Sequence, residues 1–107
     1  DERRIALLGS GAVVVNTSRG AVVDTEALAR ALCEGRIWGA GLDVYEEEPL
    51  PRDHPILAAP RTVLTPHSAY FSEESIVELR RRCFMNGVRV ARGEDGADVV
   101  NPEVLAG

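Results

Sequence analysis

Three short polar stretches hold the side chains that could carry out acid–base chemistry. Between them they contain an arginine, several carboxylates and a histidine, in Asn16-Thr17-Ser18-Arg19-Gly20, in Asp43 with Glu46-Glu47-Glu48, and in Thr65-Pro66-His67-Ser68. A histidine exchanges protons near neutral pH because its ordinary pKa is about 6.5. A carboxylate beside it favours the imidazolium form, and an arginine binds a substrate carboxylate through two parallel hydrogen bonds.

This set of groups suits hydride transfer between a 2-hydroxy acid and a nicotinamide cofactor. His67 would exchange the hydroxyl proton, Glu48 would pair with His67, and Arg19 would bind the substrate carboxylate. Structural roles without catalytic function are the alternative for the carboxylates. Acidic runs such as 46–48 are usually solvated loops, and Asp43 could cap a turn. His54, in an Asp-His-Pro loop, is assigned an ordinary role.

The polar stretches follow three apolar runs that we expect to be strands. The runs cover residues 12–17, 37–44 and 62–65. The first is β-branched without alternation, which is typical of a strand buried on both faces of a parallel sheet. Because ligands bind outside the carboxyl ends of parallel strands, the three polar stretches should converge at one edge.

Helical patterns separate and follow these strands. A short helix is expected over 5–8, a second after an Asp24 cap over 25–32 with Gly35 as its stop, and a long one from Ser72 to about Arg92. Residues 45–60 should be loop, 93–96 a turn, and 99–105 an extended apolar segment. The fold class is therefore α/β: the carboxy-terminal half of a Rossmann-like doubly wound parallel sheet, with a long terminal helix and extended tail.

Composition excludes several classes of protein. The 107 residues carry a net charge of -5, and their one basic cluster is 80–82, which argues against nucleic-acid binding. No apolar run reaches the roughly 20 residues of a membrane span and no signal peptide opens the chain, so a cytoplasmic location is expected. Cys33 and Cys83 are predicted to be buried free thiols, with no disulfide and no metal site.

The blocks Val15-Asn16-Thr17-Ser18-Arg19-Gly20, Gly41 to Pro49 and Leu64 to Ala69 resemble, in order and spacing, those of the D-isomer-specific 2-hydroxyacid dehydrogenases. The resemblance runs from about Ala12 to Leu105. Residues 66–74 are also similar to the subgroup of phosphoglycerate dehydrogenases and carboxy-terminal-binding corepressors.

The resemblance implies an NAD-dependent oxidoreductase acting on a 2-hydroxy or 2-oxo acid. It implies Arg19, Glu48 and His67 as catalytic residues, and it selects Glu48 among the three glutamates. The implied cofactor-binding residues are Thr17, Ser18, Arg19, Asp43, His67, Ser68 and Ala69. Residues 1–71 would be half of the NAD-binding domain, and residues 72–107 a helix and tail that return to a substrate domain.

The chain departs from that family in lacking a GxGxxG turn for the cofactor pyrophosphate. It begins at Asp1 and has one methionine, Met85, so we expect a fragment that is inactive alone. Its last helix and tail, without their partner, predict a homodimer or aggregation. The alternative is an NAD-sensing, partner-binding protein of the corepressor type, which could keep the same residues.

Overall fold

The computed structural model describes residues 1–103, and its contacts divide the chain into two compact units. The first unit is Asp1–Ala69 and the second begins at Tyr70. This division lies two residues before the boundary expected from the sequence. The roles expected for the two parts remain predictions.

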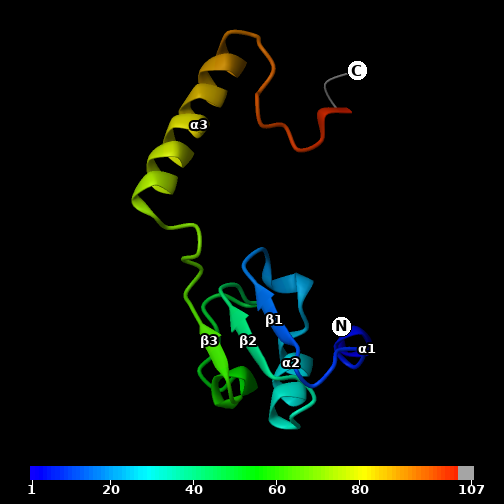
Figure 1. Ribbon diagram of the computed structural model, residues 1–107. Helices are drawn as coiled ribbons and strands as arrows, with labels where there is room; N and C mark the ends of the chain where they lie inside the picture. Colours follow the sequence, from blue (N-terminus) through cyan, green and yellow to red (C-terminus); the bar gives the residue numbers. More distant parts are fainter. Residues whose placement is uncertain (104–107) are drawn as a thin grey trace. The chain divides into compact units, whose positions relative to one another are not determined.

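The first unit contains a three-stranded parallel sheet (Figure 1). Strands β1 (Val13–Asn16), β2 (Gly39–Leu42) and β3 (Thr62–Leu64) lie in the order β1-β2-β3. Asn16 pairs with Leu42, and Leu42 with Leu64, so all three strands end at the same edge. The predicted α/β class with parallel strands is confirmed, and each strand is shorter than the apolar run that predicted it.

Helix α2 (Thr25–Cys33) connects β1 to β2 as the sequence predicts. The Asp24 side chain accepts a hydrogen bond from the Ala27 N–H at 2.9 Å, which caps the helix. Gly35 follows with a φ of 70°, the left-handed conformation in which glycine commonly ends a helix. Leu28 and Leu32 lie on the buried face, each at 0% exposure.

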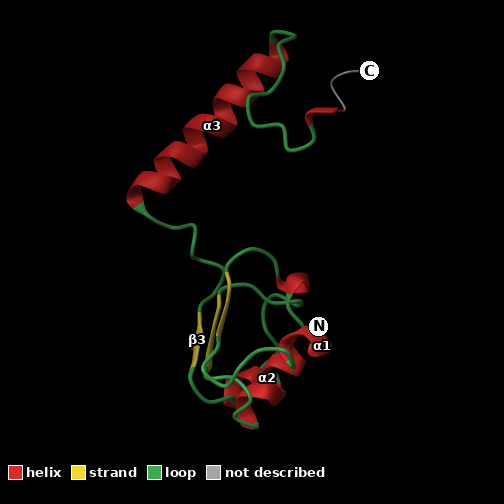
Figure 2. Cartoon of the chain, turned by 45° about the vertical axis from the view of Figure 1, so that its right-hand side comes forward, coloured by secondary structure: helices red, strands yellow, loops and turns green. Residues whose placement is uncertain are grey.

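The core lies on one side of the sheet, where the helices pack (Figure 2). Two short elements differ from the sequence prediction. The first helix, α1, is Glu2–Ile5 rather than 5–8, and the expected loop 45–60 contains a 3-10 turn, η2 (Pro55–Ala58), which buries Ile56. His54 caps that turn by accepting a hydrogen bond from the Ile56 N–H, a structural role that fits its ordinary assignment.

Two burial predictions were wrong. The first strand was expected to be buried on both faces, but Val13 and Val15 are 53% and 67% exposed, and Val63 of β3 is 67% exposed. These side chains point to the sheet face opposite the core, and no element of the unit Asp1–Ala69 covers that face. Cys33 and Cys83 are free, as predicted, but both are exposed.

The second unit contains α3 (Glu73–Ala91), a long helix that begins at the predicted Ser72 cap. Arg81 and Arg82 both pair with Glu78, and Arg82 also contacts Asp98 of the following segment. No residue of α3 is buried. Residues 104–107, part of the expected extended tail, lie outside the described residues. Within residues 1–103, no helix is long and apolar enough to cross a membrane.

Candidate active site

The carboxyl ends of the three strands lead into three loops at one edge of the sheet. The ladder continues one residue past the strands, because the Asp43 N–H donates to the Asn16 carbonyl at 3.0 Å and the Thr65 N–H donates to the Leu42 carbonyl at 2.9 Å. The loops that follow, 17–20, 43–48 and 65–69, are those expected to converge. They occupy the position at which parallel α/β sheets bind ligands.

Asn16 shapes the loop that carries Arg19. Its side chain is buried and donates to the Arg19 carbonyl at 2.9 Å, while its Oδ1 accepts from both the N–H and the hydroxyl of Ser18. The Arg19 guanidinium donates to the Ser18 carbonyl at 2.7 Å and is otherwise directed to solvent. The loop therefore fixes the backbone of Arg19 and leaves its charge available to an anion.

Asp43 organises the loop that carries His67. It is 3% exposed, and its carboxylate accepts hydrogen bonds from the Ser68 N–H at 2.8 Å, the Ala69 N–H at 2.9 Å and the Thr65 hydroxyl. The Thr65 hydrogen bond, followed by the two backbone bonds and the nearby His67, holds the pKa of Asp43 below its ordinary value, although burial opposes this. Asp43 is therefore a buried carboxylate whose hydrogen bonds keep it ionised.

His67 itself has a φ of 54°, a left-handed conformation that is uncommon outside glycine. The His67 N–H donates to the Asp43 carbonyl at 2.8 Å, and the next two N–H groups donate to the Asp43 side chain. Backbone conformations of this kind persist where the surroundings determine them. The three hydrogen bonds that Asp43 accepts from the N–H groups of His67, Ser68 and Ala69 constrain the His67 backbone in this way.

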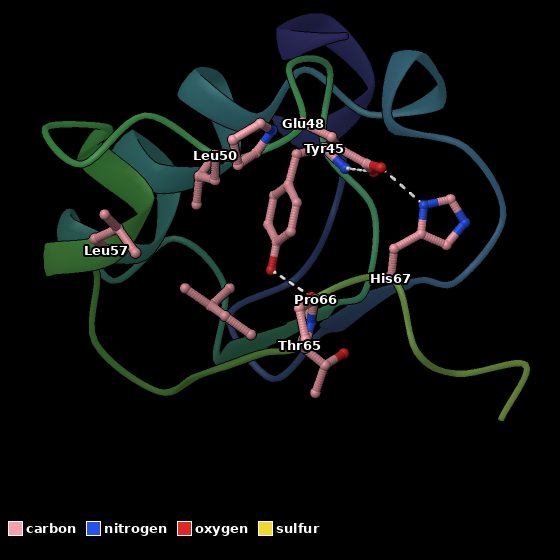
Figure 3. A pocket seen from close by; sticks show the side chains of 9 residues that line it. Tyr45, Glu48, Leu50, Leu57, Thr65, Pro66 and His67 are labelled. Atoms are coloured by element: carbon pink, nitrogen blue, oxygen red, sulfur yellow. Dashed lines mark hydrogen bonds and ion pairs between the residues drawn. The ribbon is translucent and has the colours of Figure 1, made fainter. Parts of the chain in front are cut away.

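Glu48 is the glutamate that contacts His67, with its Oε2 2.8 Å from the His67 Nδ1 (Figure 3). Its other oxygen accepts from the Tyr45 N–H at 3.0 Å. The hydrogen bond with His67, then that from Tyr45, lowers the pKa of Glu48 below its ordinary value. Glu46 is instead hydrogen-bonded to Thr25. The structure therefore distinguishes Glu48 from Glu46, whereas the sequence selected Glu48 among the three glutamates only through the family resemblance.

Arg19, Glu48 and His67 line one cavity of about 310 Å³, together with Tyr45. A second cavity of about 370 Å³, drawn in Figure 3, is also lined by Glu48 and His67. Its other lining side chains are mainly apolar and include Leu50 and Leu57. The first cavity thus brings together a cation, an ionised carboxylate and an imidazole. Such a set can bind a small carboxylate and exchange a proton with it.

Two contributors to the site were not singled out from the sequence. The Tyr45 hydroxyl lies 3.1 Å from both the Leu42 and Thr65 carbonyls, and burial raises the pKa of Tyr45 above its ordinary value. Gly20 packs so closely on the next loop that an added Cβ would lie 1.9 Å from the Tyr45 backbone. The glycine directly after Arg19 was the available signal for this close approach.

The residues expected to bind the cofactor lie at this same edge, in loops 17–19, 43 and 67–69. The Ser68 and Ala69 N–H groups donate to Asp43, which uses these two backbone donors inside the protein. Among donors in residues 1–103, the Asp43 Oδ2 accepts a hydrogen bond from the Ala69 N–H alone, and a carboxylate oxygen has capacity for a second donor. This acceptor fits the amide N–H of a nicotinamide carboxamide.

In a comparison with known protein families, residues 1–69 match the family "D-isomer specific 2-hydroxyacid dehydrogenase, NAD binding domain". Among curated proteins, a glyoxylate reductase of Korarchaeum cryptofilum is 44% identical over 104 residues, which are 97% of this chain and 31% of that protein. A glyoxylate/hydroxypyruvate reductase B of Pectobacterium carotovorum is 40% identical over 102 residues, 95% of this chain and 32% of that protein. The chain therefore spans about a third of the length of these relatives.

The chain is also similar to solved structures of dehydrogenases, again over only part of their length. A protein from Thermus thermophilus has a TM-score of 0.80 at 39% identity, over 92% of this chain and 32% of that one. A D-lactate dehydrogenase from Lactobacillus jensenii, solved with NAD+, has a TM-score of 0.77 at 32% identity, over 92% and 34%. A Xanthobacter autotrophicus D-isomer specific 2-hydroxyacid dehydrogenase, solved with NADPH and MES, has a TM-score of 0.79 at 37% identity, over 96% and 42%.

Proposed function

We propose a specific reaction for this chain, on the premise that it belongs to the D-isomer specific 2-hydroxyacid dehydrogenase family. The reaction is the reduction of a small 2-oxo acid of the glyoxylate class to the 2-hydroxy acid. The observation that carries the proposal is the 2.8 Å contact between Glu48 and His67 in a cavity that Arg19 also lines.

Each of the three residues has one part in the proposed reaction. Arg19 binds the substrate carboxylate and orients the 2-oxo group. Glu48 accepts a hydrogen bond from the Nδ1–H of His67, which fixes the tautomer and stabilises the imidazolium. His67 donates its Nε2 proton to the substrate carbonyl oxygen as that oxygen gains negative charge, and it recovers a proton from solvent afterwards.

A nicotinamide dinucleotide, when bound, would supply a hydride, which is one proton with two electrons, to the substrate C2. We propose that Asp43 accepts a hydrogen bond from the nicotinamide carboxamide N–H. The other residues proposed to line the cofactor are Thr17, Ser18, Arg19, His67, Ser68 and Ala69. NAD is the cofactor proposed first. The solved relatives carry NAD+ in one case and NADPH in another, so the assay compares both.

The named relatives guide the choice of substrate. They are glyoxylate and glyoxylate/hydroxypyruvate reductases rather than members of the phosphoglycerate dehydrogenase or corepressor subgroup. We therefore place glyoxylate and hydroxypyruvate ahead of larger 2-oxo acids. The proposed homodimer is supported by the apolar side chains that α3 exposes, among them Val77, Leu79 and Phe84.

The test is oxidation of NADH and NADPH by the full-length gene product with glyoxylate and hydroxypyruvate. His67→Ala should lower kcat by about 10²- to 10⁴-fold, the usual contribution of a general acid. His54→Asn is the matched control, because it changes the other histidine of the chain, lies outside the cavity and keeps an acceptor for the Ile56 N–H. Equal turnover by both variants would contradict the proposed role of His67.

A further inference from the structure

We propose that Glu46 is a positioning residue, which fastens the loop 45–48 to the first residue of helix α2 and thereby holds Glu48 against His67. The inference rests on the proposed function of the Glu48 and His67 pair. It assigns a separate task to a neighbouring carboxylate that does not contact the imidazole.

The contact that carries this inference joins residues 21 positions apart. The Glu46 Oε1 accepts the Thr25 N–H at 2.8 Å, and its Oε2 accepts the Thr25 hydroxyl. Thr25 is 1% exposed and begins α2, where backbone N–H groups have no partner within the helix. The Asp24 cap bonds to Ala27 and leaves the Thr25 N–H to Glu46. The negative charge also lies at the positive end of the helix dipole.

The loop between Glu46 and Glu48 has little freedom once Glu46 is held. The Tyr45 N–H bonds to Glu48, and the Tyr45 hydroxyl lies at the ends of β2 and β3. The backbone of Gly20 also packs directly on Tyr45 and Glu46. The loop is therefore fixed at the strand ends by Tyr45 and at α2 by Glu46, and Glu48, two residues after Glu46, bonds to the Tyr45 N–H and to His67.

Glu47 supplies a matched comparison within the same loop. It has the same charge and lies between Glu46 and Glu48, yet its side chain makes none of the hydrogen bonds or ion pairs found in residues 1–103. A general effect of acidic charge on the active site would be shared by Glu46 and Glu47. A positioning effect belongs to Glu46 alone.

The experiment compares Glu46→Ala with Glu47→Ala in the full-length gene product. Two quantities are measured: the Glu48 carboxyl pKa by ¹³C NMR, and the pH profile of kcat for glyoxylate reduction. The other charged groups that face Glu48 are His67, Asp43 and, across the cavity, Arg19, and neither variant alters them. Glu46 lines the same cavity, so loss of its negative charge would by itself lower the Glu48 pKa, the direction opposite to that expected from a displaced Glu48.

In the wild type the Glu48 pKa should lie below its ordinary value of 4.5. Glu46→Ala should raise the Glu48 pKa toward 4.5 and shift the acid limb of the kcat profile to higher pH. It should also lower kcat by about tenfold or more, because small displacements of catalytic groups slow the reaction strongly. Glu47→Ala should change neither quantity. Glu46→Gln, which keeps an oxygen that can accept the Thr25 N–H, should restore part of the loss.

The outcomes separate this inference from the proposed function. An unchanged Glu48 pKa in folded Glu46→Ala, with an active wild type, would overturn the positioning role alone. An inactive wild type whose Glu48 pKa responds to Glu46→Ala would overturn the proposed reaction alone. If Glu46→Ala does not fold, the Glu48 pKa is compared in Thr25→Val and Thr25→Ser instead. The valine variant lacks the hydroxyl that bonds to Glu46 and should have a raised Glu48 pKa, whereas the serine variant keeps a hydroxyl and should not. Equal Glu48 pKa values in the two variants would contradict the inference.

Discussion

Replacing Gly20 by alanine should separate two of the loops that form the candidate site. An added Cβ would lie 1.9 Å from the carbonyl carbon and oxygen of Tyr45 and 2.4 Å from the Glu46 nitrogen, all of them backbone atoms that cannot rotate away. Ordinary contact begins at 3.4 Å, so the loops must move apart by about 1.5 Å. The backbone at Gly20 has no positive φ, so the clash, rather than glycine's conformational freedom, causes the effect.

The separation has two measurable consequences. Forcing extra volume into a packed site costs about 1–3 kcal/mol in free energy of unfolding. The movement also shifts Arg19 relative to Glu48 and His67, and a misplacement of about 1 Å can lower turnover by about 10²-fold. Urea denaturation measures the first effect, and glyoxylate reduction by the full-length gene product measures the second.

Gly11→Ala is the control, because a Cβ at Gly11 would meet nothing within 4 Å and its φ is not positive. It should leave unfolding and turnover close to the wild type. If Gly20→Ala matched Gly11→Ala in both measurements, the close approach between loops 19–20 and 45–46 would not exist in the protein, and the argument from it would fail.

Three further changes test other parts of the molecule. Arg19→Lys should raise the KM for glyoxylate by about 10- to 100-fold in steady-state kinetics, because lysine cannot form both parallel hydrogen bonds and a bond between charged groups is worth about 1.5–3 kcal/mol. Leu28→Ala should lower the free energy of unfolding in urea by about 2–5 kcal/mol, since Leu28 is fully buried, whereas the exposed Leu79→Ala should change it little. The hydrogen bonds from Arg81 and Arg82 lower the pKa of Glu78 to about 2. The stability that these bonds give α3 is therefore present above pH 4.5 and is lost as the pH falls through about 2. Circular dichroism should show this loss of helix in the wild type and not in Glu78→Gln.

Local signals in the sequence predicted most of the elements. Asp24 and Ser72 cap the helices that their positions indicate, and Gly35 ends α2, because capping depends on residues close together in the chain. The two-sided burial of β1 was wrong for a different reason. Val13 and Val15 have the composition of a covered strand, but their exposure depends on what packs on the sheet, which a local pattern does not record.

The candidate site was predicted as a set of residues, and the structure adds how they are held. Arg19, Glu48 and His67 could be placed at one edge because parallel strands end together. The bonds from Asp43 to the loop after β3, and from Glu46 to Thr25, join residues that are distant in the sequence and have no local signature. Their catalytic and cofactor-binding roles remain predictions for the experiments above.

The division of the chain at Ala69 has a consequence for how such a protein can diverge. Every group proposed for catalysis, together with its hydrogen-bond partners, lies between Asn16 and Ala69 in the first unit. Substitutions from Tyr70 onward therefore replace none of the hydrogen-bonded groups that set the acid–base geometry, whereas substitutions in α3 change the surface that this helix presents. We expect descendants of this sequence to acquire new assembly partners through α3 while inheriting the same chemistry, so that the two halves of the chain evolve at different rates.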